Sequence, residues 1–211
     1  NALLFSRWSG GKWSESKVIA EGKKFLINWA DFPSITALED GTLLAHWLEK
    51  SGSAVYDYVA PFVHSRDGGK TWSKPERPHR DGDKGDHGFV SVVSMDGGQA
   101  AVIWLDARQK SEFEHSGIDE GGAAAQALYA SFFDEGHLGK EILLDSKVCD
   151  CCQTTAVRSG DGVLAVYRDR SDTEIRDMGT VLFTQKGAQN PGRLCADGWK
   201  IKGCPVNGPY A

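Results

Sequence analysis

The chain has no apolar run long enough to cross a membrane, and no run of basic residues exceeds two. A transmembrane helix needs about 20 consecutive apolar residues, so no membrane span is expected. No signal peptide precedes Asn1. The formal net charge is −5, which would repel a phosphate backbone. The acidic net charge and the lack of a longer basic run argue against nucleic acid as a partner.

A sustained helical period is also missing, and methionine is scarce, with two residues. Glycine is abundant, with 25 residues, and seven Trp and nine Phe supply large apolar side chains. Short runs of β-branched and apolar residues alternate with Gly-rich and Asp-rich turns. The sequence therefore predicts an all-β protein.

One segment carries a specific turn motif, Ser65-Arg66-Asp67-Gly68-Gly69-Lys70-Thr71-Trp72. It matches the pattern S-x-D-x-G-x-T-W at Ser65, Asp67, Gly69, Thr71 and Trp72. An Asp side chain can accept bonds from amides further along the turn, glycines accept positive φ, and the Trp anchors the returning strand. We therefore expect a structural hairpin turn here, with no catalytic role.

Asp-Gly pairs repeat along the chain at Asp40, Asp96 and Asp161, at intervals of about 60 residues. Each is flanked by apolar residues, as a tight hairpin requires. Degraded versions of the Ser65 motif occur in phase, beginning at Ser6, Ser131 and Thr184. We expect a repeated unit of four strands, with first strands near 33–38, 89–94 and 154–159.

The Ser65 motif, the repeat and the runs NWADFPS, DHGFVS, WLDAR, VCDCCQT, YRDRSDTEIRD and GCPVNGP resemble bacterial exo-α-sialidase-like proteins of the Asp-box (BNR repeat) family. The resemblance implies a β-propeller of four-stranded blades, six-bladed when complete. The chain would then supply about three and a half blades. The expected divisions of this single partial domain are 1–27 (end of a blade), 28–84, 85–145 and 146–203 (blades) and 204–211 (start of the next).

Closed propellers usually need about four to eight blades, so this length leaves the propeller incomplete. Three explanations stay open: a fragment of a longer propeller, completion by a second copy, or a shortened chain. The fragment is the preferred explanation, because exposed blade edges invite pairing with other chains.

Five cysteines are present, three of them in Val148-Cys149-Asp150-Cys151-Cys152. Cys204 begins the last expected blade, whose inner end should lie near this cluster. A disulfide between the cluster and Cys204 in an exported protein is one hypothesis. Buried free thiols and a soft-metal site for copper or zinc are the others.

Other chemistry-bearing residues cluster just before the expected first strands and just after the second strands. Blade geometry could turn them toward one shallow basin, where Arg would bind carboxylate and aromatic rings would stack on sugars. The candidates for binding substrate are Trp29, His87, Asp106, Arg108, Arg168 and Arg170. The candidate catalytic residues are Asp31, whose aromatic neighbours would raise its pKa, and Glu174.

Simpler explanations compete with these roles. The Arg and Asp residues could be ion pairs that tie one blade to the next. His87 could belong to a loop that enters a strand, and His46 could be a packed strand residue. His64, His79, His115 and His137 are expected in loops or at the surface.

Sialidases use three Arg to hold the sugar carboxylate, a Tyr assisted by Glu as nucleophile, and an Asp as acid/base. The resemblance thus implies Asp31 as acid/base and Glu174 as the assisting carboxylate. The Arg-Ile-Pro segment of the first Arg is missing, and no Tyr can be placed as nucleophile.

The leading hypothesis is a sialidase-like glycoside hydrolase that acts on sialic acid or another acidic glycan, without a cofactor, in the periplasm or outside the cell. The alternatives are a noncatalytic propeller that binds a glycan or a partner protein, and a metal or redox protein built on the cysteine cluster.

Overall fold

The computed structural model describes residues 1–82, 85–108, 125–201, 203 and 205–210. Its described part is all-β, with one short 3₁₀ turn, η1 (Asp96–Gly98). The strands are β1 (Ala2–Phe5), β2 (Trp8–Ser9), β3 (Lys12–Trp13), β4 (Lys17–Glu21), β5 (Ser34–Ala37), β6 (Leu43–His46), β7 (Glu49–Lys50), β8 (Tyr58–Val59), β9 (Phe62–Ser65), β10 (His87–Ser94), β11 (Ala100–Asp106), β12 (Gln126–Asp134), β13 (His137–Leu138), β14 (Ile142–Val148), β15 (Thr155–Ser159), β16 (Gly162–Arg168), β17 (Met178–Thr184), β18 (Gly187–Ala188) and β19 (Gly192–Arg193).

The same antiparallel meander recurs along the chain. In one sheet β10, β11 and β12 are neighbours, and β12 then pairs with both β13 and β14. In the next, β15, β16 and β17 follow in order, and β17 pairs with β18 and β19. A third sheet has the order β5-β6-β9. The predicted first strands are confirmed, because β5, β10 and β15 begin within two residues of their expected starts.

Strand β11 shows why the sheets stack. All seven of its residues are buried. Ala101, Ile103 and Leu105 pack in a core shared with β16 and β17, whereas Val102 and Trp104 pack in a second core with residues of β6 and β9. Successive side chains of a strand point to opposite faces, so this sheet is covered on both sides.

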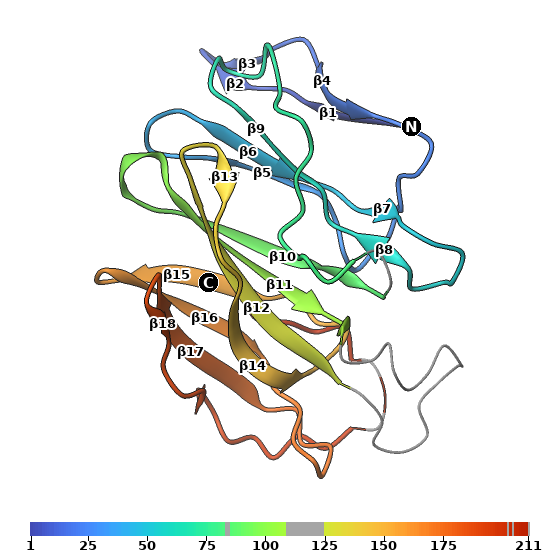
Figure 1. The fold of residues 1–211 in the computed structure, drawn as a ribbon, viewed down its shortest axis with the longest axis vertical. Coiled ribbons are helices and arrows are strands. Elements are labelled where there is room, and N and C mark those ends of the chain that lie inside the picture. The colour runs from blue at the N-terminus through green and yellow to red at the C-terminus, as the bar shows by residue number, and fades with distance from the viewer. Residues whose placement is uncertain (83–84, 109–124, 202, 204, 211) are drawn as a thin grey trace.

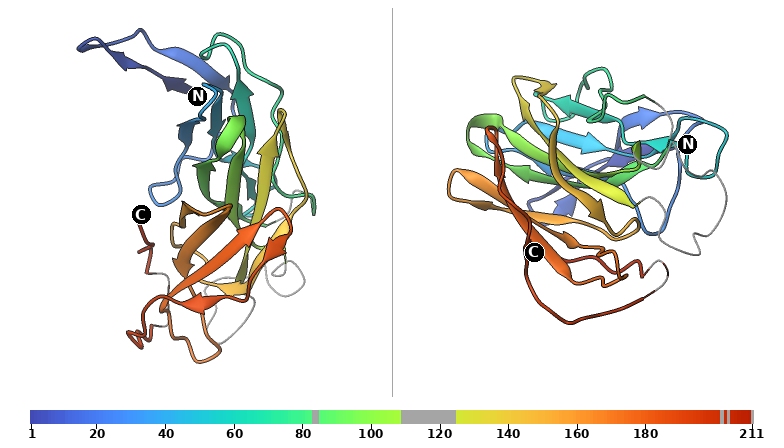
Figure 2. Two further views of the ribbon diagram at one scale, coloured as in Figure 1. Left: turned by 90° about the vertical axis from the view of Figure 1, so that its left-hand side faces the viewer. Right: turned by 60° about the horizontal axis from the view of Figure 1, so that its bottom comes forward.

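The sheets follow one another along the longest axis of the molecule, from β1 and β4 at one end to β15, β16 and β17 at the other (Figure 1). The left-hand view of Figure 2 shows the same succession from the side. A third core joins β4 to β6 and β9 through Ile19, Ala45 and Val63. Each sheet is thus stabilised mainly by apolar contact with its neighbours.

The Ser65–Trp72 turn has the expected internal bonding. Asp67 Oδ1 accepts the N–H groups of Lys70 (2.9 Å) and Thr71 (3.0 Å), and its Oδ2 accepts the Thr71 hydroxyl (2.7 Å). Ser65 Oγ donates to Asp67 (2.8 Å) and accepts the N–H of Gly69 (2.8 Å). These bonds hold the Asp67 pKa well below its usual value, chiefly through Thr71. The motif is a fold element, as the sequence predicts.

The turn also docks on the preceding sheet. The rings of Trp72 and Phe5 meet edge to face, with centroids 5.9 Å apart. Gly69 has φ +76°, and a Cβ there would collide with the Phe5 ring. Gly68 has a similar φ of +71° but open space beside it. Of these two glycines, Gly69 alone needs both the positive φ and the absence of a Cβ.

The Asp-Gly turns meet at the same end of the strands as the Ser65–Trp72 turn, because Leu43, just after the Asp40-Gly41 turn, pairs with Ser65. The Arg158 guanidinium contacts Glu39 (3.0 Å) and Asp96 (2.7 Å), which belong to the two preceding turns. The predicted repeat of these turns thus places three of them side by side.

No sheet within the described residues closes on itself, and the sheets contain two, three or five strands. The number of blades and their four-stranded form stay predictions. The described residues contain no helix that is long and apolar enough to cross a membrane.

Candidate functional site

Antiparallel pairing gathers the predicted site residues at one end of the sheets. The start of β10 pairs with the end of β11, so that His87 lies opposite Asp106. The Cys149 N–H donates to the Arg168 carbonyl at 3.0 Å, which joins the cysteine segment to the end of β16. This end lies away from the Asp-Gly turns and forms the candidate site.

Asp31 is buried, with 3% of its surface exposed. Its Oδ2 accepts the backbone N–H of Phe89 at 2.8 Å. Burial raises the Asp31 pKa to about 7; the Phe89 N–H opposes this rise and the charge of Asp86 adds to it. Gly88 leaves no room for a side chain beside the carboxyl group. A carboxyl group with this pKa can give or take a proton near neutral pH.

Tyr58 lies beside Asp31 and was not singled out in the sequence. Burial, followed by the charges of Asp86 and Asp31, raises its pKa well above 10. The Gln126 side-chain amide donates to Asp86, and Tyr58 forms a parallel bridge with Asp86. Two carboxyl groups and a phenol therefore share one buried region.

His87 is fully buried and forms a second cluster with His79 and Asp81. Asp81 contacts His79 Nδ1 at 3.0 Å and His87 Nε2 at 3.1 Å. The two imidazole rings stack with centroids 3.6 Å apart. Burial lowers the His87 pKa, but the hydrogen bond to Asp81 and the charges of Asp106 and Asp81 outweigh it, so the net shift is upward. His79 lies in a loop, which is one of the two expected places, but it is buried in the stacked pair and is not a surface residue.

Asp106 and Arg108 form an ion pair with two contacts, at 2.9 Å from Nε to Oδ1 and 2.7 Å from Nη2 to Oδ2. The Trp104 indole N–H also donates to Asp106 (2.9 Å), and Arg108 Nη1 reaches Glu141 at 2.9 Å. The Arg108 guanidinium covers the Tyr129 ring at 4.1 Å. This arrangement supports the ion-pair alternative for Arg108.

Arg170 and Glu174 are also paired. Glu174 Oε1 accepts from Arg170 Nη2 (3.0 Å), and Oε2 accepts from Arg176 Nη2 (2.6 Å). Burial alone would raise the Glu174 pKa, but these hydrogen bonds lower it below its usual value. Glu174 is therefore an ionised carboxylate that positions two arginines.

Arg168 differs from the other predicted arginines. Its guanidinium donates to the carbonyls of Asn207 (2.7 Å) and Arg176 (2.6 Å). It also lies over the Trp199 ring at 4.5 Å. Within the part of the chain that the structure describes, Arg168 makes no ion pair with a carboxylate.

An open groove of about 530 Å³ runs past Arg168 and is called the Trp199 groove here. Its lining residues are Arg168, Met178, Asp197, Gly198, Trp199, Lys200 and Asn207. It offers two cationic groups, one aromatic ring and several polar groups, which suits an anionic ligand with an apolar face.

A chain of contacts links this groove to the Asp31 segment. The Gln153 side-chain amide donates to the Ala30 carbonyl at 2.6 Å, and Gly208 packs against the Gln153 backbone. The neighbouring Asn207 contacts Arg168. Segments from three parts of the chain therefore contact one another here.

The cysteine cluster adjoins the groove, because the Asn207 N–H donates to Cys152 Sγ at 3.4 Å. Cys149 and Cys152 are free and buried, with their Sγ atoms 3.5 Å apart. Cys151 is disulfide-bonded, and its sulfur lies within 4.8 Å of theirs. The predicted pairing with Cys204 falls outside the described residues.

Trp29 is 82% exposed and free to stack on a ligand. His46, in contrast, is buried against Phe62, as the packing alternative predicts. Sequence reasoning missed Trp199 and Tyr58, because their importance depends on contacts between distant segments.

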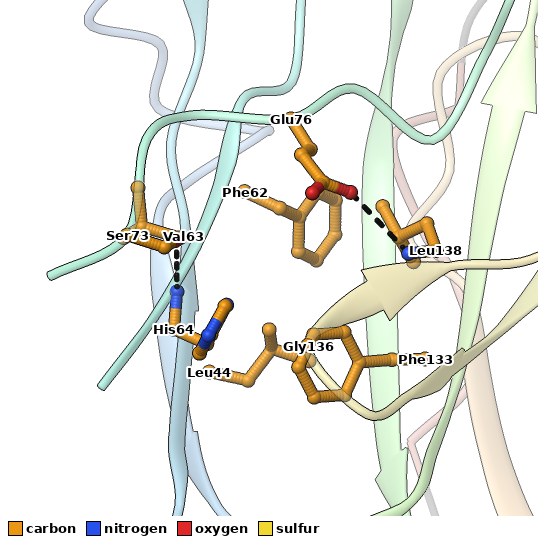
Figure 3. A pocket seen from close by; sticks show the side chains of 9 residues that line it. All are labelled: Leu44, Phe62, Val63, His64, Ser73, Glu76, Phe133, Gly136 and Leu138. Atoms are coloured by element: carbon orange, nitrogen blue, oxygen red, sulfur yellow. Dashed lines mark hydrogen bonds between the residues drawn. The ribbon is translucent and has the colours of Figure 1, made fainter. Parts of the chain in front are cut away.

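A second hollow lies between β9 and the β12–β13 hairpin (Figure 3). Glu76 accepts the Leu138 N–H there at 3.3 Å, and the His64 N–H donates to Ser73 Oγ at 3.0 Å. Its volume of about 10 Å³ admits a single water molecule. The hollow is a packing contact between neighbouring sheets, and it is too small for a sugar.

Comparison with known proteins gives neither a matching family model nor a matching curated protein. Solved structures are similar in fold. The Hadza microbial sialidase Hz136 has a TM-score of 0.54 at 12% identity, over 77% of this chain and 37% of that one. NanB sialidase from Streptococcus pneumoniae has a TM-score of 0.54 at 13% identity, over 90% and 28%.

An α-L-arabinanase from Penicillium chrysogenum is similar with a TM-score of 0.52 at 15% identity, over 95% of this chain and 62% of that one. The chain thus spans less than two thirds of each of these proteins. The likeness shows the fold: the protein has the all-β architecture of β-propeller glycosidases.

Proposed function

We propose that the protein is a sialidase-like glycoside hydrolase, of the Asp-box kind, that acts on sialic acid or another acidic glycan. The observation that carries this proposal is the Trp199 groove, where the buried Arg168 has no carboxylate partner among the described residues. A ligand carboxylate would balance its charge, and the Trp199 ring would support the sugar.

Asp31 is the proposed general acid/base, because it is the buried carboxyl group whose pKa lies near neutrality. Trp29 would complete the sugar site from the same segment. Glu174 would act by fixing Arg170 and Arg176. The roles of His87, Asp106 and Arg108 would be to hold the end of the β10–β11 hairpin in place, since their polar groups already contact one another.

The proposed organisation is a single partial propeller with divisions at 1–27, 28–84, 85–145, 146–203 and 204–211, completed by further sequence or by another chain. The disulfide at Cys151 supports an exported location, periplasmic or extracellular, because disulfides persist in oxidising compartments.

The test is product release from a panel of aryl glycosides and acidic oligosaccharides, sialosides included. We expect turnover by the wild-type protein and its loss in Arg168→Ala. Arg7→Ala is the matched control, because Arg7 is an exposed arginine in the distant connection between β1 and β2. Equal turnover in Arg168→Ala and wild type would overturn the role of Arg168.

A noncatalytic glycan-binding propeller is the second candidate. The engagement of Arg108, Arg170 and Glu174 in ion pairs favours it. It predicts saturable binding of an acidic glycan without product, and binding weakened by Arg168→Ala.

A further inference from the structure

The two free cysteines of the cluster form a C-x-x-C pair that is hidden inside the run Cys149-Asp150-Cys151-Cys152. Their exposed fractions are 1% and 2%, and the distance between the Sγ atoms is 3.5 Å. That distance suits a proton shared between a thiol and a thiolate, and it is close enough for a disulfide after small side-chain rotations.

Positive and N–H groups surround the pair. Arg176 Nη1 lies 3.1 Å from Cys149 Sγ, and the Asn207 N–H donates to Cys152 Sγ at 3.4 Å. The Cys149 hydrogen bond lowers the Cys152 pKa to about 7; burial opposes this, and the Asn207 N–H and Arg168 add to it. The Cys149 pKa is raised, chiefly by the same hydrogen bond. One sulfur therefore carries the negative charge while the other keeps its proton.

The oxidation state of Cys151 decides between a metal site and a redox pair. A soft metal would gain a third ligand only if Cys151 were a thiol, but Cys151 is disulfide-bonded. Thiol–disulfide exchange requires a thiolate next to a second thiol, and Cys152 and Cys149 form such a pair.

We propose that Cys149 and Cys152 are a redox-active dithiol, oxidised reversibly to a disulfide by a low-molecular-weight disulfide, with Cys152 as the attacking thiolate. Cys152 itself does not line the Trp199 groove, but Asn207 and Arg168 line the groove and adjoin Cys152, so the proposed route to the thiol is from this groove.

The exchange has two steps. Cys152 Sγ attacks one sulfur of the small disulfide, whose S–S bond breaks and releases one thiolate. Cys149 then loses its proton to solvent and attacks Cys152 Sγ, which forms the Cys149–Cys152 bond and releases the second thiolate. Two electrons pass from the protein to the small disulfide, and the proton from Cys149 ends on a released thiol.

The first experiment equilibrates the full chain at graded ratios of oxidised to reduced dithiothreitol, followed by acid quench, denaturation and alkylation. Mass spectrometry should show the thiols of Cys149 and Cys152 disappearing together, with a cross-linked peptide that joins them. Cys149→Ser and Cys152→Ser should abolish the cross-link, and Cys195→Ser should leave it unchanged. Alkylation of both thiols at the most oxidising ratio would overturn the proposal.

A second experiment tests the attacking role of Cys152. Its alkylation rate by iodoacetamide should rise with pH around a midpoint near 7, and Arg168→Gln should move the midpoint upward. An unchanged midpoint in a folded Arg168→Gln variant would contradict this role. One tightly bound copper or zinc per chain that blocks both thiols would also overturn the proposal. None of these readouts depends on glycan turnover.

Discussion

The Asp31 carboxylate and the Phe89 backbone are joined across 58 residues of sequence by one hydrogen bond of 2.8 Å. Phe89 itself has a φ of +51°, which is rare for a residue with a bulky side chain. Asp31 thus ties the segment before β5 to the start of β10, and it does so from a buried position.

Asp31→Asn should make the protein more stable at high pH. The folded-state pKa of about 7 exceeds the usual 3.8, so the folded protein binds more protons and stability falls as pH rises from about 4 to 7. The full difference is on the order of 4 kcal/mol. Urea unfolding from pH 4.5 to 8.5 should show this fall in the wild type and its loss in Asp31→Asn. Parallel curves for the two proteins would contradict the assignment.

The same variant should lose glycoside hydrolysis, if Asp31 is the proposed general acid/base. Wild-type kcat should decline above about pH 7 as the acid form is depleted. A variant that gains stability while losing turnover would separate catalysis from folding. Full turnover in Asp31→Asn would remove Asp31 from the mechanism.

His87 should contribute stability over a different range of pH. Its pKa is raised above 6.5 in the folded state, so its contribution is fully present below that value and is lost as pH rises through the folded-state pKa. His87→Gln should therefore flatten the unfolding free energy above pH 6.5. Amide exchange at β10 measures whether the variant keeps the local fold.

Gly69→Ala and Gly68→Ala form a matched pair. Both place an alanine at positive φ, at a cost of about 1–2 kcal/mol. Only Gly69→Ala also meets the Phe5 ring, which should add about 1–3 kcal/mol. A double-mutant cycle with Phe5→Ala should erase the difference. Equal denaturation midpoints of the two single variants would show that the turn does not press on Phe5.

Trp199→Ala should weaken the binding of an acidic glycan and remove a cation–π contact worth about 0.5–1 kcal/mol. Trp13→Ala is the control, because Trp13 is 66% exposed and lies in the β2–β3 hairpin. Isothermal titration with a sialoside and its carboxyl-methylated analogue separates ring stacking from charge recognition. Equal affinity of both Trp variants would exclude the groove as the sugar site.

The repeated meander could be predicted from sequence because each hairpin is encoded locally. The Asp-Gly turns and the Ser65–Trp72 motif specify backbone conformations within a few residues, and the tertiary structure follows those signals. The first strands consequently appear where the spacing places them.

The site was harder to predict, because its polar groups find partners across the fold. Arg108 reaches Glu141 over 33 residues, which sequence spacing could not reveal. His79 is buried because its ring, from the loop before β10, stacks on the ring of His87 at the start of β10. Arg168 was chosen together with Arg108 and Arg170, yet only the structure separates it from them through the groove.

The contact of Phe5 with Trp72 and Gly69 couples the stability of one sheet to that of the next, as between the units of a linear repeat protein. The turn of one sheet fills a space against the sheet before it, and the same relation recurs where Glu76 meets Leu138. Coupling between nearest neighbours of this kind makes unfolding spread from unit to unit, as in repeat proteins. Loosening a single interface would therefore divide the protein into two cooperative blocks, each melting at its own temperature.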